Sequence, residues 1–271
     1  MKKLLLLLFS LFFLSSTAVF ADDISDFEKG LTAYHSGDYA TALREWKLLA
    51  EQGYDAAQYN LGYMYDKGIG IPEDNKTAVK WYTLAAEQGD SDSQNNLGLM
   101  YLNADGIPQD CKTALKWLTL ASKQDDYDAQ TSLGYMYSEG LGVKQDYKIA
   151  LKWYRTSAEH GYDISQFNLG TMYDEGRGVP QDYKTAVKWY RLSAEQGDSD
   201  AQYNLGLSYY YGEGVIQDNV YAHMWTNIAA SNGDEDGVIA RDIIGKEMSS
   251  ADISQAQKLA RECVAKNYKG C

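Results

Sequence analysis

The chain has 271 residues, and its 38 acidic residues outnumber 25 basic ones, so the formal net charge is -13. A protein this acidic lacks the basic surface that a general nucleic-acid binder needs, and three cysteines are too few for a disulfide-dense scaffold. With 45% hydrophobic and 23% charged residues, the composition is typical of a globular protein rather than a disordered one.

The N-terminus has the pattern of a secretory signal. Two lysines follow the first Met, residues 4–14 are apolar apart from Ser10, and small residues lead to Ala21. This pattern predicts a signal peptide over residues 1–21, cleaved after Ala21. An uncleaved anchor is the alternative, but the apolar core is shorter than the ~20 residues of a membrane-spanning helix. We therefore expect a periplasmic or secreted protein with no membrane span after cleavage.

From residue 55 to residue 234 the sequence repeats itself every 36 residues. A Leu-Gly pair begins at Leu61, Leu97, Leu133, Leu169 and Leu205, and a tryptophan recurs at Trp81, Trp117, Trp153, Trp189 and Trp225. Gln, Tyr, Asp and Ala recur with the same period at other phases. Agreement at so many phases indicates five structural repeats of one kind.

Each repeat is predicted to form two helices, called here the first and the second helix. Apolar residues of the first helix, such as Leu61, recur at helical spacing, and the helix stops at a Gly-x-Gly stretch. Asp74 is placed to cap the second helix, since its carboxylate can accept first-turn amides. We expect Gly62 to let the two helices cross closely and Trp81 to fill the space between repeats, so that every tryptophan in this phase is buried.

The two ends depart from the regular pattern. Residues 22–54 resemble a shorter variant repeat, and residues 235–271 are predicted to be capping helices that give the array a soluble end. Export implies an oxidising compartment, where Cys263 and Cys271 could form a disulfide that folds the tail onto the last helix. Cys111 is then an isolated thiol; its pairing with a tail cysteine, or between molecules, is the alternative.

Residue patterns typical of catalysis or cofactor binding are missing from the sequence. It has no Ser-x-x-Lys, Gly-x-Ser-x-Gly, His-Glu-x-x-His or P-loop pattern, and the Gly-x-Gly stretches lack a third glycine. The three histidines, His35, His160 and His223, occupy different repeat phases, so a metal site is not expected. We predict no catalytic residue, no metal and no cofactor.

The repeated residues resemble the Sel-one-like repeat family, a subclass of the tetratricopeptide-like repeats. The matching motif runs from Ala57 to Tyr65, then from Gly68 to Tyr82 and from Ala85 to Gly89. The resemblance implies an all-α superhelix (solenoid) of 36-residue helix-turn-helix repeats. In that family the first helices line a concave side that binds proteins or peptides.

By this resemblance, exposed concave positions lie two before, two after and five after each repeated Leu. They are Tyr59, Tyr63, Asp66, Asn95, Leu99, Leu102, Thr131, Tyr135, Ser138, Phe167, Thr171, Asp174, Tyr203, Leu207 and Tyr210. Spacings of four and three put each trio on one face of a helix. Aromatic and aliphatic side chains are frequent among them, as is common at protein interfaces; the alternative is that they are solvated or packing residues.

These observations predict an exported, monomeric, non-catalytic scaffold that binds a protein or peptide partner on its concave face. Such a protein could serve as an adaptor, an assembly factor or a secreted interaction protein. The alternative is an envelope protein that binds peptidoglycan or β-lactams and has weak hydrolase activity, as described for some relatives. Those relatives carry a cysteine pair in each repeat, whereas this chain does not.

Overall fold

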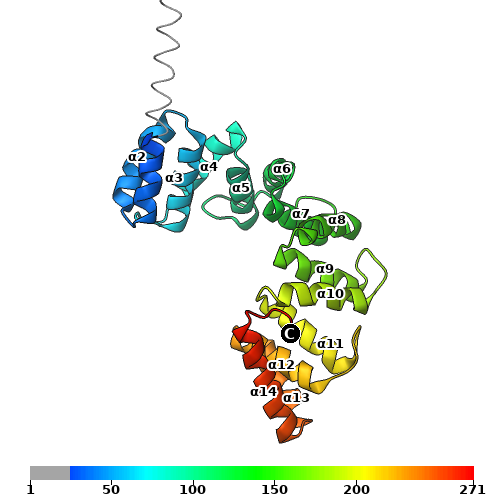
Figure 1. Ribbon diagram of the computed structural model, residues 1–271. Coiled ribbons are helices and arrows are strands. Elements are labelled where there is room, and N and C mark those ends of the chain that lie inside the picture. The colour runs from blue at the N-terminus through cyan, green and yellow to red at the C-terminus, as the bar shows by residue number, and fades with distance from the viewer. Residues whose placement is uncertain (1–24) are drawn as a thin grey trace, which may run out of the picture. The chain divides into compact units, whose positions relative to one another are not determined.

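The computed structural model describes residues 25–271, and the predicted signal peptide lies outside the described residues. Helices make up all the regular structure in that range, as Figure 1 shows. The first helices are α3 (Asp55–Lys67), α5 (Ser91–Asn103), α7 (Tyr127–Glu139), α9 (Asp163–Glu175) and α11 (Ser199–Tyr211). The second helices are α4 (Asn75–Gln88), α6 (Cys111–Ser122), α8 (Tyr147–Glu159), α10 (Tyr183–Ala194) and α12 (Asn219–Ser231). Helix α2 (Tyr39–Glu51) precedes them, and α13 (Glu235–Lys246) and α14 (Ser250–Ala265) follow.

The helices divide into two compact units, one ending at Asp126 and the other comprising Tyr127–Cys271. Within each unit the first and second helices of a repeat pack on each other, and each second helix also packs on the next first helix. Residues 25–35 form a further helix before α2. The predicted all-α helical-repeat architecture is thereby confirmed.

The repeated aspartate caps every second helix of the five repeats. The side chains of Asp74, Asp110, Asp146, Asp182 and Asp218 accept first-turn backbone N–H groups. In three repeats a threonine hydroxyl also donates to the cap, as Thr185 does to Asp182 at 2.6 Å. Hydrogen bonds from this hydroxyl and from its backbone N–H lower the pKa of the Asp182 carboxyl. The capping role inferred from the sequence is therefore correct.

The turns between the helices require left-handed backbone, which explains the Gly-x-Gly stretch. Gly68 and Gly70 have φ of 65° and 70°. In the second repeat Ala104 stands in the position of Gly68 and keeps φ at 67°, and Asp125 replaces the glycine that ends the second helix at φ 60°. A side chain in this conformation costs roughly 1 kcal/mol, so the turn geometry is conserved even where glycine is absent.

The close crossing of first and second helices places the repeated glycine against the residue that follows the tryptophan. A Cβ atom added at Gly170 would lie 2.7 Å from the Tyr190 ring, and one at Gly134 would lie 2.7 Å from Tyr154. That residue fills the crossing, and the burial of the tryptophan beside it differs from repeat to repeat. Trp117 and Trp225 are buried, but Trp81, Trp153 and Trp189 are partly exposed. The expectation that every tryptophan is buried is therefore wrong for these three.

A buried glutamine joins neighbouring repeats, a role that sequence reasoning did not assign. Gln166 Nε2 donates to the Ala158 carbonyl of the preceding second helix at 3.1 Å. Its Oε1 accepts from Gln196 Nε2, at the end of its own second helix, at 2.9 Å. The same pair of bonds forms at Gln58, Gln94 and Gln202. Since each glutamine is buried, these bonds fix the stacking of one repeat on the next.

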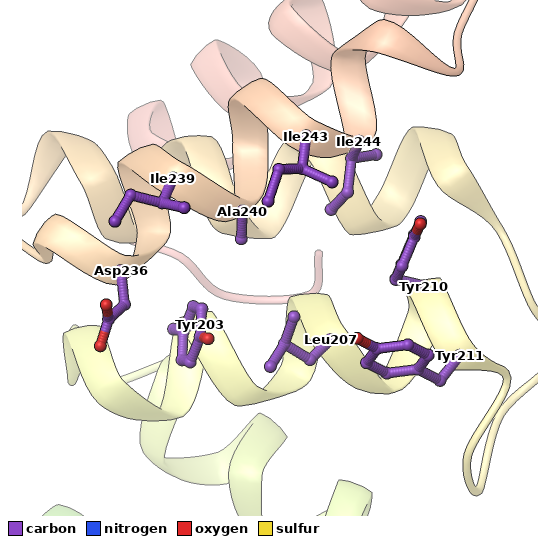
Figure 2. Close-up of a pocket in the computed structure, with 9 residues that line it drawn as sticks. All are labelled: Tyr203, Leu207, Tyr210, Tyr211, Asp236, Ile239, Ala240, Ile243 and Ile244. Carbon is purple, nitrogen blue, oxygen red and sulfur yellow. The ribbon is translucent and has the colours of Figure 1, made fainter.

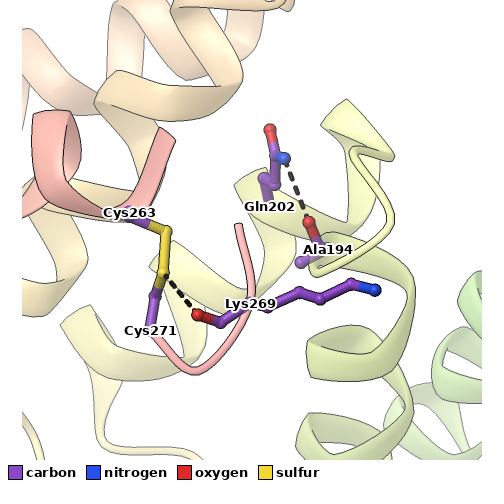
Figure 3. Close-up of a disulfide and its surroundings, with 5 residues drawn as sticks. All are labelled: Ala194, Gln202, Cys263, Lys269 and Cys271. Atoms are coloured by element: carbon purple, nitrogen blue, oxygen red, sulfur yellow. Dashed lines mark hydrogen bonds between the residues drawn. A yellow bond between two sulfur atoms is a disulfide. The ribbon is translucent and has the colours of Figure 1, made fainter. Parts of the chain in front are cut away.

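A disulfide joins Cys263 to Cys271, with their Cα atoms 5.6 Å apart, and Cys111 is free. Figure 3 shows the bridged tail beside Ala194 and Gln202. Tyr268 of the tail lies against Gly197, and its hydroxyl donates to Asn232 Oδ1 at 3.2 Å. The disulfide therefore folds the tail back onto α14, as predicted, and the folded tail contacts the last repeat.

His223 on α12 occupies a phase that holds Val79, Leu115, Leu151 and Val187 in the other repeats. It is 5% exposed. Burial and the nearby Arg241 guanidinium lower its pKa, whereas Asp242 opposes the shift. Of the other side chains around it from α12, α13 and α14, Lys246 is basic and Asn227 and Gln257 are neutral.

We expect His223→Leu to remove part of the loss of stability on acidification. Below the ordinary value of 6.5 the unfolded chain binds a proton that the folded chain resists. Stability therefore falls as the pH drops below 6.5, by at most about 1.4 kcal/mol per pH unit for one group. Thermal unfolding at pH 7 and pH 5 measures the difference between wild type and variant. The exposed His35 gives the control His35→Leu; the same effect in both variants would contradict the assignment.

Candidate functional site

Most of the fifteen predicted concave positions are at least partly open to solvent, but three are not. Asn95, Leu102 and Ser138 are buried, with exposed fractions of 9%, 6% and 8%. The expectation of an exposed position is wrong for these three. Because so little of each side chain reaches solvent, these three positions offer no surface that a partner can contact.

In two repeats the position five after the repeated Leu lies beside the residue that fills the helix crossing. The Tyr82 hydroxyl donates to Asp66 Oδ2 at 3.5 Å, and burial together with the neighbouring Asp174 carboxylate raises the pKa of Tyr190. Burial and the neighbouring carboxylates Glu213 and Glu175 raise the pKa of Asp174. These side chains therefore have an internal role, which sequence phase alone did not reveal.

In two repeats the residue two before the repeated Leu is aromatic and packs on the tyrosine that fills the helix crossing. Phe167 packs on Tyr190 with ring centroids 6.0 Å apart, and Tyr59 packs on Tyr82 at the same distance. Burial, followed by the carboxylates of Asp92 and Asp90, raises the pKa of Tyr59 to about 12, so its hydroxyl stays protonated at neutral pH.

Thr131 is bound internally as well. Its Oγ1 donates to the Tyr127 carbonyl at 2.8 Å and lies 2.7 Å from Ser165 Oγ. Thr171 donates to the Phe167 carbonyl at 3.2 Å and accepts from the Tyr190 hydroxyl at 3.4 Å. Both threonines are therefore engaged within the protein, although each is partly exposed.

The position two after the repeated Leu carries a large apolar side chain that is at least partly exposed in four of the five repeats. Tyr63 and Leu99 of the first unit and Tyr135 and Leu207 of the second are partly or largely exposed, and Tyr135 is 49% exposed. We call these four residues the open face. An aromatic or aliphatic side chain there is available for contact in each compact unit.

In the fifth repeat the predicted positions line a depression. Tyr203, Leu207 and Tyr210 of α11 face α13 across a cavity of about 160 Å³. Figure 2 shows side chains of both helices directed into this space. From α13 the lining includes Ile239 and Ile243. The structure thus brings together all three predicted positions of this repeat with residues that sequence reasoning missed.

The 36-residue period, carried one step past the last regular repeat, would have found Ile239 and Ile243. They lie 36 residues after Tyr203 and Leu207. The Leu-Gly pair is absent from α13, where Arg241 and Asp242 stand instead, so the repeated motif does not mark this helix. Helix α13 therefore keeps apolar residues at two of the surface positions although it has lost the Leu-Gly pair.

Among residues 25–271, no group of three or more His, Cys, Asp and Glu side chains is arranged to hold a metal ion. None of the helices in this described range has the length and apolar character that a bilayer crossing requires.

The family model of the Sel1 repeat matches residues 55–90, 91–126, 128–162, 163–198 and 199–234, together more than half of the chain. No significant match is found among curated proteins.

Two solved structures are similar over almost the whole chain. The protein c5321 of Escherichia coli, described as a protective antigen of uropathogenic strains with an SLR fold, is 34% identical with a TM-score of 0.85. The match covers 93% of this chain but only 56% of the E. coli protein. A Sel1 repeat protein from Oxalobacter formigenes is 32% identical with a TM-score of 0.77, over 91% of this chain and 97% of that one. The chain therefore belongs to the Sel1 repeat family, whose members are generally non-catalytic scaffolds for protein interactions.

Proposed function

We propose that this protein is exported and binds a protein or peptide partner through the surface of its first helices. The observation that carries the proposal is the open face, Tyr63, Leu99, Tyr135 and Leu207. These side chains remain accessible while the repeated Leu beside each of them is buried. The chemistry of the surface differs from repeat to repeat on a constant scaffold, which suits recognition of one particular partner.

Export rests on two separate observations. Residues 1–21 have the sequence pattern of a cleaved signal, and the Cys263–Cys271 disulfide is characteristic of an oxidising compartment. A non-catalytic role agrees with the absence of a nucleophile motif from the sequence and with the general character of the family. The acidic charge favours basic partners through long-range attraction.

The test is a binding experiment with protein exported by a bacterial host. We expect the full chain to be recovered from the periplasm with Asp22 as its first residue; a product that retains Met1 would contradict export. This material, immobilised, should retain a polypeptide from envelope extract. Purified partner should then bind the variant Tyr63→Ser/Leu99→Ser/Tyr135→Ser at least tenfold more weakly, because three apolar contacts are lost.

The matched control replaces exposed apolar residues of second helices, Leu84→Ser/Ile149→Ser/Leu192→Ser. Circular dichroism must show that both triple variants are folded. If the two variants bind the partner equally well, the first-helix surface is not the binding site.

A further inference from the structure

The groove between α11 and α13 has room for one large side chain of a ligand. Both helices pack mainly on α12 and meet each other at few residues, which leaves the cavity of about 160 Å³ open to solvent. A cavity of roughly 150 Å³ accommodates a benzene ring, whereas sites for drug-sized molecules occupy about 300–1,000 Å³. The groove therefore suits one large apolar side chain rather than a whole sugar chain or antibiotic.

The rim of this groove keeps large apolar surface in water. Tyr211, Ile239 and Ile243 are 63%, 58% and 49% exposed. A single exposed apolar residue is ordinary, but a contiguous apolar patch marks a contact site. All three line the same groove, together with the partly buried Tyr203 and Leu207.

Carboxylates lie at the two ends of the groove. Asp236 lines the end near the start of α13, and Asp236 and Asp234 help to raise the pKa of Tyr203 after burial. At the other end Glu247 accepts a hydrogen bond from the Tyr210 hydroxyl at 3.0 Å. The basic residues of α13, Arg241 and Lys246, line a separate depression beside His223. The electrostatic potential along the groove is therefore negative.

Building on the proposed function, we propose that this groove binds an extended peptide segment with one large apolar side chain between two basic residues. The apolar side chain lies among Leu207, Ile239 and Ile243, and the two cations reach Asp236 and Glu247. Asp236 and Glu247, the residue that follows α13, are eleven positions apart, which corresponds to about 16 Å along a helix. An extended peptide covers this distance in about five residues. The basic residues of the ligand are therefore about five positions apart, with the apolar residue between them.

A displayed library of random twelve-residue peptides, panned on the whole mature protein, tests this proposal. We expect enrichment of a large aliphatic or aromatic residue flanked by Lys or Arg at that spacing. A synthetic peptide with the enriched sequence should bind Ile239→Ser/Ile243→Ser at least tenfold more weakly than wild type. The control is Ile216→Ser, the same chemical change at a residue that is 90% exposed after α11; its affinity should not change.

The charge requirement has its own variants. Asp236→Asn/Glu247→Gln should weaken binding of the peptide and reduce its salt dependence, whereas Glu87→Gln, an exposed carboxylate on α4, should do neither. Enrichment of peptides without basic residues, or binding unaffected by the isoleucine variant, would overturn the proposal. If only the Tyr63→Ser/Leu99→Ser/Tyr135→Ser variant binds the selected peptides more weakly, the groove proposal is overturned, whereas binding by the first-helix surface is supported. No enrichment at all would reject the groove, while the partner experiment still decides the broader function.

Discussion

Trp225→Ala is expected to lower the free energy of unfolding by about 3–5 kcal/mol, the usual range for a fully buried large aromatic residue. Its indole ring is completely buried and belongs to a cluster with Leu205 and Cys263. This cluster joins α10, α11, α12 and α14, so the cavity would lie where the last repeat meets its cap. Chemical denaturation monitored by circular dichroism measures the loss.

Trp153→Ala is the matched comparison, because this tryptophan has the same repeat phase but is partly exposed. We expect a clearly smaller loss than at Trp225. Trp225→Phe provides a second control. The indole N–H of Trp225 has no hydrogen-bond partner among the described residues, so replacing the ring with a smaller aromatic one should cost far less than its removal. Equal losses in the two alanine variants would contradict the burial pattern.

Gly170→Leu is expected to destabilise the protein by about 3 kcal/mol or more, at the upper end for an overpacked core. The Cβ atom alone would lie 2.7 Å from the Tyr190 ring and 3.3 Å from the Ala186 carbonyl oxygen. The better helix propensity of leucine offsets at most about 1 kcal/mol of this. Thermal and denaturant unfolding of the variant measure the effect.

A double-mutant cycle distinguishes steric overlap from a general defect. Tyr190→Ala alone should cost about 3–5 kcal/mol because it leaves a cavity. In the combination Gly170→Leu/Tyr190→Ala the new side chain can occupy part of that cavity. The double variant should therefore be more stable than the sum of the single losses predicts, by about 0.5–3 kcal/mol. Strict additivity would show that the two residues do not share one space.

The helix pairs were predictable because their causes are local. Asp182 caps the helix that follows it, and Gly68 and Gly70 adopt the left-handed backbone of the turn, so their roles depend on near neighbours. The period also showed which residue types recur. It did not reveal that Tyr190, rather than Trp189, fills the crossing, because both positions recur every 36 residues with large side chains. The two side chains point about 100° apart around the helix, and only the packing of the helices decides which of them faces the partner helix.

The surface positions were less predictable, because exposure depends on the partner helix. Leu102 and Ser138 have the phase of surface residues but are buried. Ile239 and Ile243 line the groove although α13 lacks the Leu-Gly pair that marks the other first helices in the sequence.

The sequence by itself determined the repeat, its two helices and the capping residues, because hydrophobic periodicity and capping act over a few residues of chain. The tertiary structure alone decided which side chains each crossing buries, how the buried glutamines join successive repeats, and where a groove opens between α11 and α13. Those features depend on how packed helices approach and orient toward each other, and the side chains between the helices set that approach.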